Sequence, residues 1–410
     1  MKIALLSKAD ASGGGASRIA EELSHLLNNS GHTAHHYLSL KRADNCTARS
    51  LYGSFTWGRP LRRWHHLIKH AGFPELVPWE LLPLYLQQIH HYDLIHFHDL
   101  SSAISPLTVR YLARKIPTVW TFHDCSPFTG GCLYPLDCRN YQTRCGNCPQ
   151  LGEWPIDTRW DFTGFMQDIK RKTAQEHCFW AVVPSSWMVT QAMHSNMFTV
   201  PPHIIPNGLD IRTFKPLDKF VIRRKLNLPE DRFIILLTAA YLHDERKGIK
   251  YSLQALNEIA EINPYILLVG HIDQQTRSSF TRFDHFCTGY IADNRQKAEY
   301  FAAADLFIST SLAESFSLVT IETMATATPS VSFVAGGNTD LIQHNHTGYL
   351  VQPKDVAGLV TGINLALTDN RAAEWGRNAR QRAEQLYSHE IFLKNHLALY
   401  EQVIRDFRPQ

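Results

Sequence analysis

The chain has 410 residues, of which 44% are hydrophobic and 19% charged, with a formal net charge of +3. This length is too great for one ordinary hydrophobic core and suggests two domains of about 200 residues each. The composition excludes a disordered or fibrous class, and the small net charge argues against a dedicated nucleic-acid-binding protein.

The sequence shows no segment typical of a signal peptide or a membrane span. The apolar run that opens the chain, MKIALL, is soon followed by Lys8 and Asp10, so it is too short for the hydrophobic region of a signal peptide. No window approaches the ~20 apolar residues that cross a bilayer. We therefore expect a cytoplasmic protein, at most peripheral at the inner face of the plasma membrane, with its cysteines reduced or bound to metal.

The first half of the chain alternates strand-like and helix-like segments. KIALLS (2–7) is followed by a glycine-rich turn and an amphipathic segment over 17–29. Further strand-like runs are DLIHFH (93–98), TVWTFH (118–123) and FWAVVP (179–184). This alternation predicts one parallel sheet flanked by helices.

The same alternation restarts after IPNGLDIRTFKP (205–216), a segment rich in turn-forming residues. The strand-like runs of the second half are FIILLTA (233–239), YILLVG (265–270), DLFIST (305–310), SVSFV (330–334) and GYLV (348–351). We predict one domain over 1–205, a second over 206–387, and a C-terminal helix at about 388–410 that returns to the first. Doubly wound α/β domains bind ligands beyond the carboxyl ends of their strands.

The first candidate element of a site is the glycine loop SGGGASR (12–18), between the first strand and its helix. Gly13, Gly14 and Gly15 allow the backbone to approach a ligand closely, and the helix N-terminus offers unpaired amides. The loop lacks the G-x-G-x-x-G spacing of a dinucleotide-binding fingerprint. A tight turn without a ligand is an equal alternative.

Histidines end two strand-like runs of the first half. His123 ends TVWTFH beside Asp124, where it could orient and polarise a sugar hydroxyl, and a packing histidine is the alternative. The two histidines of HFHD (96–99) end the preceding run, and we interpret both as packing residues.

A basic turn, RKG (246–248), precedes the first long helix expected in the second half. Lys247 can reach a diphosphate as a point charge, and Arg246 can bind it through two parallel hydrogen bonds. A solvated basic turn is the alternative.

Two acids stand in SLAESFSLVTIETMA (311–325), after the run DLFIST. Glu314 precedes a helix that we expect to begin at Ser315, beside unpaired amides that suit sugar hydroxyls and phosphate. Glu322 lies two turns into that helix among apolar residues, so it must find hydrogen-bond donors, which a ribose diol would supply. From spacing alone, a helix-end acid and a satisfied core acid are the alternatives.

Taken in order, these motifs resemble those of the retaining glycosyltransferases of family 4, which have the GT-B fold of two Rossmann-like doubly wound domains facing across a cleft. The resemblance covers the whole chain and includes IPNGLD (205–210), the diglycine 336–337 and GYLV. It implies that His123 and Glu314 are catalytic and that the glycine loop lies on the acceptor side. It also implies a donor-binding set of Arg246, Lys247, Glu314, Ser315, Phe316, Ser317 and Glu322. The sequence departs from the family at Tyr241, where an arginine is common.

The resemblance implies a hexosyltransferase that moves a sugar, with retention of configuration, from a nucleotide-diphosphate sugar co-substrate to a glycan or lipid-linked glycan. Synthesis of a bacterial exopolysaccharide, capsule or lipopolysaccharide is the expected setting. No catalytic metal is expected, because Lys247, Arg246 and backbone amides would stabilise the leaving group. A sugar-nucleotide epimerase with the same fold is the alternative, and it would act on a sugar nucleotide without an acceptor.

Four cysteines follow His123 with the spacing C-x5-C-x6-C-x2-C: Cys132, Cys138, Cys145 and Cys148. The segment CGNCP is typical of a turn that holds Zn²⁺, so the four could form a structural zinc site, whereas reduced cysteines in a loop are the alternative. A similar cysteine-rich segment follows the His-Asp pair in resembling enzymes of surface-polysaccharide synthesis. A zinc-knuckle nucleic-acid module is a weaker alternative, and the net charge argues against it.

The segment WGRPLRRWHHLIKHAGF (57–73) mixes basic and aromatic residues. It could rest on an anionic membrane surface that carries lipid-linked acceptors, although a solvated helix face is the default interpretation. We therefore expect no nucleic-acid partner and at most a peripheral membrane contact.

Overall fold

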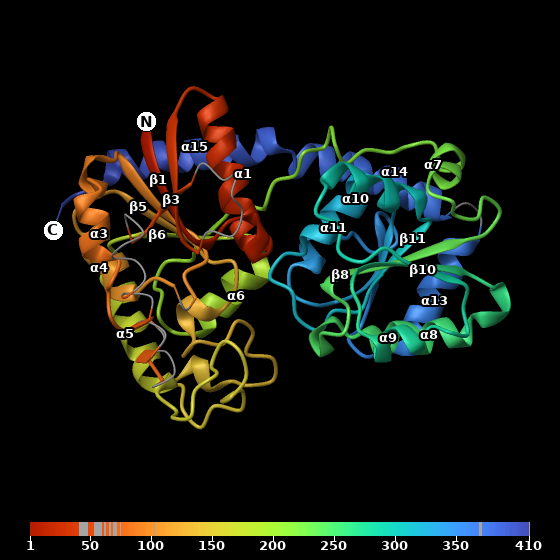
Figure 1. The fold of residues 1–410 in the computed structure, drawn as a ribbon, viewed down its shortest axis with the longest axis horizontal. Helices are drawn as coiled ribbons and strands as arrows, with labels where there is room; N and C mark the ends of the chain where they lie inside the picture. Colours follow the sequence, from red (N-terminus) through yellow and green to blue (C-terminus); the bar gives the residue numbers. More distant parts are fainter. Residues whose placement is uncertain are drawn as a thin grey trace. The chain divides into compact units, whose positions relative to one another are not determined.

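The computed structural model (Figure 1) describes residues 1–40, 48–52, 60, 63–64, 67–68, 72–73, 75–101, 103–368 and 371–409. The chain divides into two compact units. Unit 1 comprises Met1–Ile205 and Phe392–Gln410, and unit 2 comprises Pro206–Ile391. The first division falls at the predicted 205/206, and the second falls at 391/392 where 387/388 was predicted.

The described part of unit 1 contains a seven-stranded parallel sheet in the order β3-β2-β1-β4-β5-β6-β7. Its strands are β1 (Lys2–Ala9), β2 (Thr33–Leu40), β3 (Arg49–Ser50), β4 (Leu94–Phe97), β5 (Thr118–Thr121), β6 (Trp180–Val183) and β7 (His203–Ile204). All residues of β4 and β5 are buried, as expected for central strands of a parallel sheet covered on both faces.

The helices of unit 1 fill the connections between these strands. They are α1 (Gly15–Asn29), α3 (Leu81–Leu86), α4 (Pro106–Ala113), α5 (Thr163–Gln175) and α6 (Ser186–His194), with 3-10 turns η1 (Ala11–Gly13), η2 (Ile89–His91), η3 (Ser126–Phe128) and η4 (Asn140–Gln142). The last helix, α15 (His389–Asp406), also packs here: the buried Tyr400 hydroxyl lies 2.6 Å from Nδ1 of His96 in β4.

The described residues of unit 2 form a six-stranded parallel sheet in the order β10-β9-β8-β11-β12-β13. The strands are β8 (Ile234–Tyr241), β9 (Tyr265–His271), β10 (His285–Cys287), β11 (Leu306–Ser309), β12 (Ser330–Phe333) and β13 (Gly348–Val351). The helices are α7 (Lys219–Lys225), α8 (Ile249–Glu258), α9 (Gln274–Ser278), α10 (Asn294–Ala303), α11 (Leu318–Ala325), α12 (Asn338–Leu341), α13 (Val356–Leu367) and α14 (Arg371–Leu386), with turns η5 (Glu245–Lys247) and η6 (Ala260–Ile262).

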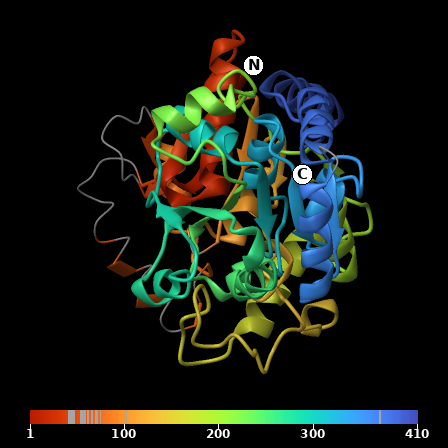
Figure 2. The same ribbon diagram turned by 90° about the vertical axis from the view of Figure 1, so that its right-hand side faces the viewer.

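Helices cover both faces of the unit 2 sheet (Figures 1 and 2). Side chains of β8 alternate between two hydrophobic clusters: Ile234 and Leu236 pack with α10, α11 and α14, whereas Ile235 and Leu237 pack with α8 and α13. This alternation follows from the two-residue period of a strand. The continuous apolar run of β8 is therefore explained by burial on both sides.

Each sheet has a topological switch point, where consecutive connections leave in opposite directions. In unit 1 it lies between β1 and β4, and in unit 2 between β8 and β11. Crevices at the carboxyl ends of strands flanking such a point are the usual ligand positions in doubly wound folds. Functional residues are therefore expected in the loops that follow these four strands.

All strand-like runs predicted from the sequence are strands in the structure. The sequence analysis did not predict β2, β3, β7 or β10. Of the segment 57–73, on which the prediction of a membrane surface rests, most residues lie outside the described part of the chain. Among the helices of the described residues, none is both long and apolar enough to cross a membrane.

Candidate active site

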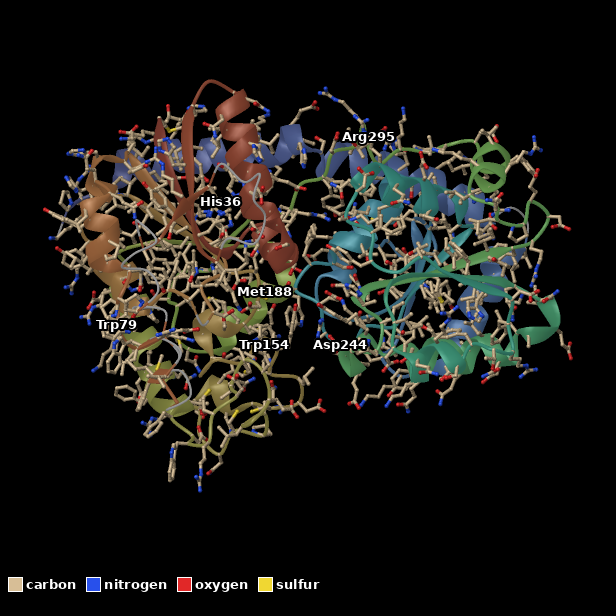
Figure 3. All side chains as sticks on the ribbon, in the orientation of Figure 1. His36, Trp79, Trp154, Met188, Asp244 and Arg295 are labelled. Carbon is tan, nitrogen blue, oxygen red and sulfur yellow. The ribbon has the colours of Figure 1, made fainter. Side chains whose placement is uncertain are left out.

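The basic turn of unit 2 is the 3-10 turn η5, which follows β8. Asp244, labelled in Figure 3, caps this turn by accepting a hydrogen bond from the N–H of Arg246 at 2.9 Å. Gly248 ends the turn with a φ of 62°, and a Cβ at this position would lie 2.2 Å from the carbonyl oxygen of Thr310. Glycine therefore lets the turn pack directly against the residues that follow β11.

Hydrogen bonds fix the turn to the segment after β11. The N–H of Leu312 donates to the carbonyl of Arg246 at 2.8 Å, and the Thr310 hydroxyl donates to the carbonyl of Lys247 at 3.1 Å. Because β8 and β11 are neighbours, these bonds hold the two loops together at one edge of the sheet. The basic turn thereby reaches Glu314.

Lys247, Arg246 and Glu314 form one charged cluster. The Lys247 ammonium donates to Oε1 of Glu314, and Nη1 of Arg246 lies 3.9 Å from the same oxygen. Arg246 also donates to the carbonyl of Ala313 at 2.9 Å. Burial raises the pKa of the Glu314 carboxyl, but Lys247 and Arg246 outweigh this effect and bring the pKa below its ordinary value. Asp244 also pairs with Arg246 at 3.1 Å, so two cations and two acids meet here, and guanidinium and ammonium groups are the side chains that bind phosphate.

The diglycine after β12 packs onto the backbone of the same loop. A Cβ at Gly336, whose φ is 55°, would lie 1.6 Å from the carbonyl oxygen of Glu314. A Cβ at Gly337 would lie 2.6 Å from the carbonyl oxygen of Ser315, and the N–H of Gly337 donates to the backbone carbonyl of Glu314 at 2.9 Å. The contact between the two loops therefore requires glycine at both positions.

The helix after Glu314 is α11, which begins at Leu318, later than the predicted Ser315. Its N-cap is Ser317 and not Ser315, and the Ser317 hydroxyl accepts from the N–H of Thr320 at 3.4 Å. Ser317 has a φ of 75°, a left-handed conformation that is uncommon for a residue with a side chain. The ring of Phe316 is only 2% exposed and packs edge-on against Tyr387, so its side chain belongs to the core, and donor binding by Phe316 stays a prediction.

Glu322 of α11 has a protein partner for its charge. Its Oε1 lies 2.8 Å from Nζ of Lys297 in α10, and the carboxylate side chain is 1% exposed. The sequence predicts that this acid needs hydrogen-bond donors, for which a ribose is one source. Lys297 is another, and nothing in its spacing relates it to Glu322. Glu322 is therefore a buried acid whose charge is paired within the protein, which was the alternative interpretation. A role in ribose binding stays a prediction.

Tyr241 occupies the position where the resemblance would place an arginine. It ends β8, is 56% exposed, and stacks on His271 at the end of β9 with ring centroids 5.2 Å apart. His271 in turn stacks on Tyr290 at 5.2 Å. The phosphate contact expected of that arginine is therefore replaced at this position by an aromatic surface.

In unit 1 the glycine loop lies at the carboxyl end of β1, beside the switch point. Gly13, Gly14 and Gly15 are all exposed. Gly14 has a φ of 119°, and a Cβ there would meet nothing within 4 Å, so the loop has open space in front of it. The conformation requires glycine, and the open surroundings leave room for a ligand.

His123 lies two residues beyond β5 and is hydrogen-bonded to His98, one residue beyond β4. Nε2 of His123 is 3.0 Å from Nδ1 of His98, and the two rings are stacked with 19° between their planes. Burial lowers the pKa of His123 to about 3 and that of His98 well below its ordinary value, so both are neutral at pH 7.

The two histidines that were interpreted as packing residues therefore differ in role. His96 is a packing residue, with its ring nitrogens 2.6 Å from the Tyr400 hydroxyl and 2.8 Å from the Thr121 hydroxyl. For His98 the interpretation was incomplete, because this residue contacts the candidate catalytic His123. The tripeptide Phe-His-Asp occurs at 97–99 and again at 122–124, and this repeat is the feature of the sequence that relates His98 to His123.

An acid pair adjoins these histidines. Burial, and then the neighbouring Asp99, raise the pKa of Asp124 to about 7. Asp124 accepts from the N–H of Ser126 at 2.7 Å, and Asp99 accepts from the hydroxyl of Ser101 at 2.9 Å. Burial raises the pKa of Asp99 as well. The carboxyl edge of β4 and β5 thus carries two neutral histidines and two acids that resist ionisation.

The four cysteines of the predicted zinc site line one cavity of about 20 Å³: Cys132, Cys138, Cys145 and Cys148. Burial raises the pKa of the Cys132 thiol to about 12 and that of the Cys145 thiol to about 11. Every cysteine in the described part of the chain is a free thiol. Within those same residues, however, no three histidine, cysteine, aspartate or glutamate side chains are positioned to hold one metal ion. The four thiols thus share one cavity, and zinc binding by them stays a prediction.

The structure brings the predicted residues into two groups, each within one unit. Arg246, Lys247, Glu314 and the diglycine meet at the β8/β11 edge of unit 2. His123 stands with His98 at the edge of β4 and β5 in unit 1, where the glycine loop follows the adjacent β1. The side chains of Phe316 and Glu322 are buried behind the loop of unit 2.

Two family models match the chain, one for each unit. The model described as Glycosyltransferase Family 4 matches residues 13–213, and the model described as Glycosyl transferases group 1 matches residues 218–382. Neither match includes α15.

Similar proteins are known from sequence and from structure. TuaC of Bacillus subtilis, whose name assigns it to teichuronic acid biosynthesis, is 30% identical over 318 residues, 77% of this chain and 68% of that protein. WcaC of Escherichia coli, whose name assigns it to colanic acid biosynthesis, is 23% identical over 332 residues, 76% of each chain. The crystal structure of HepE from Anabaena in complex with UDP and glucose has a TM-score of 0.71 at 19% identity, with 98% of this chain and 99% of that chain covered.

Proposed function

The chain belongs to glycosyltransferase family 4 and has the two-domain Rossmann-like GT-B fold, and on this premise we propose that it transfers a hexose from a nucleotide-diphosphate sugar to a glycan or lipid-linked glycan. The observation that carries the proposal is the charged cluster of Lys247, Arg246 and Glu314 at the β8/β11 switch point. This is the position at which a doubly wound fold binds its ligand.

The diphosphate of the donor would bind to the cationic side of this cluster. Lys247 and Arg246 are only 22% and 26% exposed, so their interaction with a phosphate would be less weakened by water than at an open surface. Protein groups fix both side chains. Arg246 donates hydrogen bonds to the Asp244 carboxylate and to the Ala313 carbonyl, and Lys247 donates to the Glu314 carboxylate. Such preorganised cations stabilise the negative charge that develops as the nucleotide leaves. The name of the HepE structure, which contains UDP and glucose, supports a nucleotide donor.

Glu314 would orient the transferred sugar. Its carboxylate stays ionised because Lys247 and Arg246 lower its pKa, so it can accept hydrogen bonds from sugar hydroxyls at neutral pH. We propose retention by a front-face route: the bond from C1 to the diphosphate oxygen breaks, and the bond from C1 to the acceptor oxygen forms on the same face. The acceptor proton goes to the departing phosphate, so no covalent nucleophile is needed.

The acceptor belongs to a surface polysaccharide in this proposal. Support comes from the names of TuaC and WcaC, both of which refer to the biosynthesis of such polymers. The glycine loop after β1 and His123 after β5 would contact the acceptor and the transferred sugar.

A panel of nucleotide sugars tests the donor first. Thermal unfolding of the full chain is recorded with UDP, GDP and a series of UDP- and GDP-sugars, because a ligand bound by the native state raises the unfolding temperature. One base is expected to stabilise the protein with several of its sugars. If no nucleotide at millimolar concentration shifts the transition, the donor assignment is wrong.

Turnover then separates the proposed transfer from other reactions of a sugar nucleotide. With the selected donor, nucleotide release is expected to be slow until oligosaccharide or lipid-linked acceptors are added. NMR of the product is expected to show the anomeric configuration of the donor. Conversion of the sugar nucleotide to an epimer without any acceptor would contradict the proposal, and an inverted product would contradict the front-face route.

A further inference from the structure

The same tripeptide, Phe-His-Asp, stands at the carboxyl ends of the neighbouring strands β4 and β5, at 97–99 and 122–124, and the two histidines meet. Nδ1 of His98 and Nε2 of His123 are 3.0 Å apart, a hydrogen-bond distance between two ring nitrogens. The backbone of His98 is itself fixed, because its N–H donates to the carbonyl of Leu6 in β1 at 2.9 Å. The imidazole of His98 is therefore a rigid partner for that of His123.

Two neutral imidazoles that share one hydrogen bond must divide the roles of donor and acceptor. His98 is 1% exposed and His123 is 9% exposed, and burial keeps both rings uncharged. A neutral imidazole carries one N–H and one bare nitrogen. Either His98 carries its proton on Nδ1 and donates, or it carries it on Nε2 and accepts from His123.

The other nitrogen of His98 decides between these two arrangements. Nε2 of His98 is buried and has no hydrogen-bond partner among the described residues. If that nitrogen carried the proton, the fold would hold an orphaned buried N–H, which is rarer in proteins than an unused acceptor. The arrangement in which Nδ1 of His98 is protonated avoids this cost.

We propose that His98 is a positioning residue that donates from Nδ1 to Nε2 of His123 and thereby fixes the proton of His123 on Nδ1. Within the described part of the chain, Nδ1 of His123 has no hydrogen-bond partner, so it is the nitrogen left for a ligand. His123 then meets the substrate as a neutral hydrogen-bond donor and not as a general base. This inference rests on the proposed function, and it agrees with a reaction in which the departing phosphate takes the acceptor proton.

The tautomers of His98 and His123 can be measured by NMR without an assay of enzyme activity. Long-range ¹H–¹⁵N correlation spectra of the full chain labelled with ¹⁵N-histidine distinguish a protonated ring nitrogen from a bare one. The ring signals are assigned by their loss in His98→Asn and His123→Asn. We expect both histidines to carry the proton on Nδ1 between pH 6 and 8. A protonated Nε2 on His98 would overturn the inference.

Kinetics test the positioning role. His98→Leu removes the donor at similar volume and is expected to lower kcat about tenfold or more, with the KM of the donor sugar changed less than about threefold, as for the loss of one buried hydrogen bond. His98→Asn retains an N–H near the position of Nδ1 and is expected to recover most of that loss. Unchanged kcat in a folded His98→Leu protein would overturn the inference.

His396→Gln is the matched control. His396 contacts the ring of His96, and its Nδ1 is 2.9 Å from the Phe392 carbonyl, but it has no hydrogen bond to His98 or His123. Its substitution is expected to leave the His123 tautomer and kcat unchanged. If His98→Leu does not fold, the wild-type spectrum still decides. If no donor is turned over at all, the proposed function fails while the tautomer assignment stands.

Discussion

Lys297 and Glu322 form a buried ion pair in unit 2, with 2.8 Å between Nζ and Oε1. The carboxylate side chain is 1% exposed and the ammonium side chain 14%. The Lys297 ammonium also lies over the ring of Phe214, with Nζ 5.3 Å from the ring centroid. The pair joins α10 to α11, the helix that follows the candidate donor site, so it helps to hold that helix in place.

Breaking this pair is expected to destabilise the protein strongly. Glu322→Ala leaves the Lys297 ammonium, whose side chain is 14% exposed, without its counter-charge; breaking a fully buried pair typically costs about 3–5 kcal/mol, so a cost toward the lower end of this range is expected. Urea unfolding monitored by circular dichroism measures the loss. The more exposed pair of Lys225 and Glu299, with side chains 60% and 25% exposed, provides the control, because Glu299→Ala should cost less than about 1 kcal/mol.

The double variant Lys297→Met with Glu322→Leu extends this test. Replacing both charges by apolar side chains of similar size removes the unpaired charge, so the double variant should be more stable than Glu322→Ala. If it folds, its affinity for the donor reports on Glu322 without a loss of folded protein. An affinity equal to that of the wild type would remove the predicted ribose contact of Glu322.

Lys247→Ala is expected to weaken binding of the nucleotide. A charge-assisted hydrogen bond contributes about 1.5–3 kcal/mol, so Kd for the selected nucleotide should rise roughly 10- to 150-fold. Isothermal titration calorimetry measures the change. Lys250→Ala, an exposed lysine in the first turn of α8, should leave Kd within about twofold. Equal effects of the two substitutions would refute the specific role of Lys247.

The stability of unit 1 should depend on pH through Asp124. Burial and then Asp99 raise its pKa from 3.8 to about 7, so between these values the folded state holds a proton that the unfolded state has released. Stability from this group is therefore present below about pH 4 and is lost as pH rises to about 7. Asp124→Asn should remove this dependence.

The measurement is the unfolding free energy of both proteins at a series of pH values. The wild type should lose stability relative to Asp124→Asn as pH rises from 4 to 7, and the difference should stay constant above that range. Asp137→Asn, at an exposed aspartate of the same unit, should follow the wild type. A difference that grows in favour of the wild type with rising pH would contradict the assignment.

Zinc binding by the four cysteines remains a prediction from their spacing and from the cavity that they share. The cavity of about 20 Å³ is large enough for one atom of water size, and the thiols would have to turn toward its centre to hold a metal. Metal analysis of protein purified without chelator should give about one zinc per chain. Cys148→Ser should lower this ratio and Cys287→Ser, in unit 2, should not. A wild-type protein without zinc would refute the prediction.

Gly336→Ala should be more harmful than an ordinary substitution of a glycine. A Cβ at this position would lie 1.6 Å from the carbonyl oxygen of Glu314, so the loop must move. We expect a loss of at least about 2 kcal/mol in unfolding free energy and weaker nucleotide binding. Gly289 offers a matched control, since its φ is 73° but a Cβ there meets nothing within 4 Å. Gly289→Ala should therefore show the backbone strain alone, about 1–2 kcal/mol.

Much of the fold could be predicted because buried parallel strands are short apolar runs between turn-forming residues. YILLVG and SVSFV are of this kind, and both are strands. The three strands β3, β7 and β10 have only two or three residues, too few for a periodic pattern. The segment of β2, TAHHYLSL, contains two adjacent histidines that interrupt its apolar character.

The site was predictable where strand order alone brings residues together. Lys247 and Glu314 follow neighbouring strands, and the carboxyl ends of parallel strands share one edge. Contacts between helices carry no such rule, so Lys297 could not be paired with Glu322 from the sequence. The start of α11 could not be fixed either: Ser315 and Ser317 are equally good caps, and only the backbone conformation of the loop selects Ser317.

The chain passes between its two units twice, and where both passages enter unit 2 they run beside each other. The N–H of Leu209 donates to the carbonyl of Tyr387 at 2.8 Å, and that of His389 donates to Leu209 at 3.0 Å. Unit 2 is therefore an insertion within the sequence of unit 1. A fragment that ends at residue 205 would lack Tyr400 and Val403, two buried residues of unit 1. Expression of unit 1 alone requires a fusion of residue 205 to residue 392, and proteolytic cleavage of one passage leaves the units covalently joined by the other.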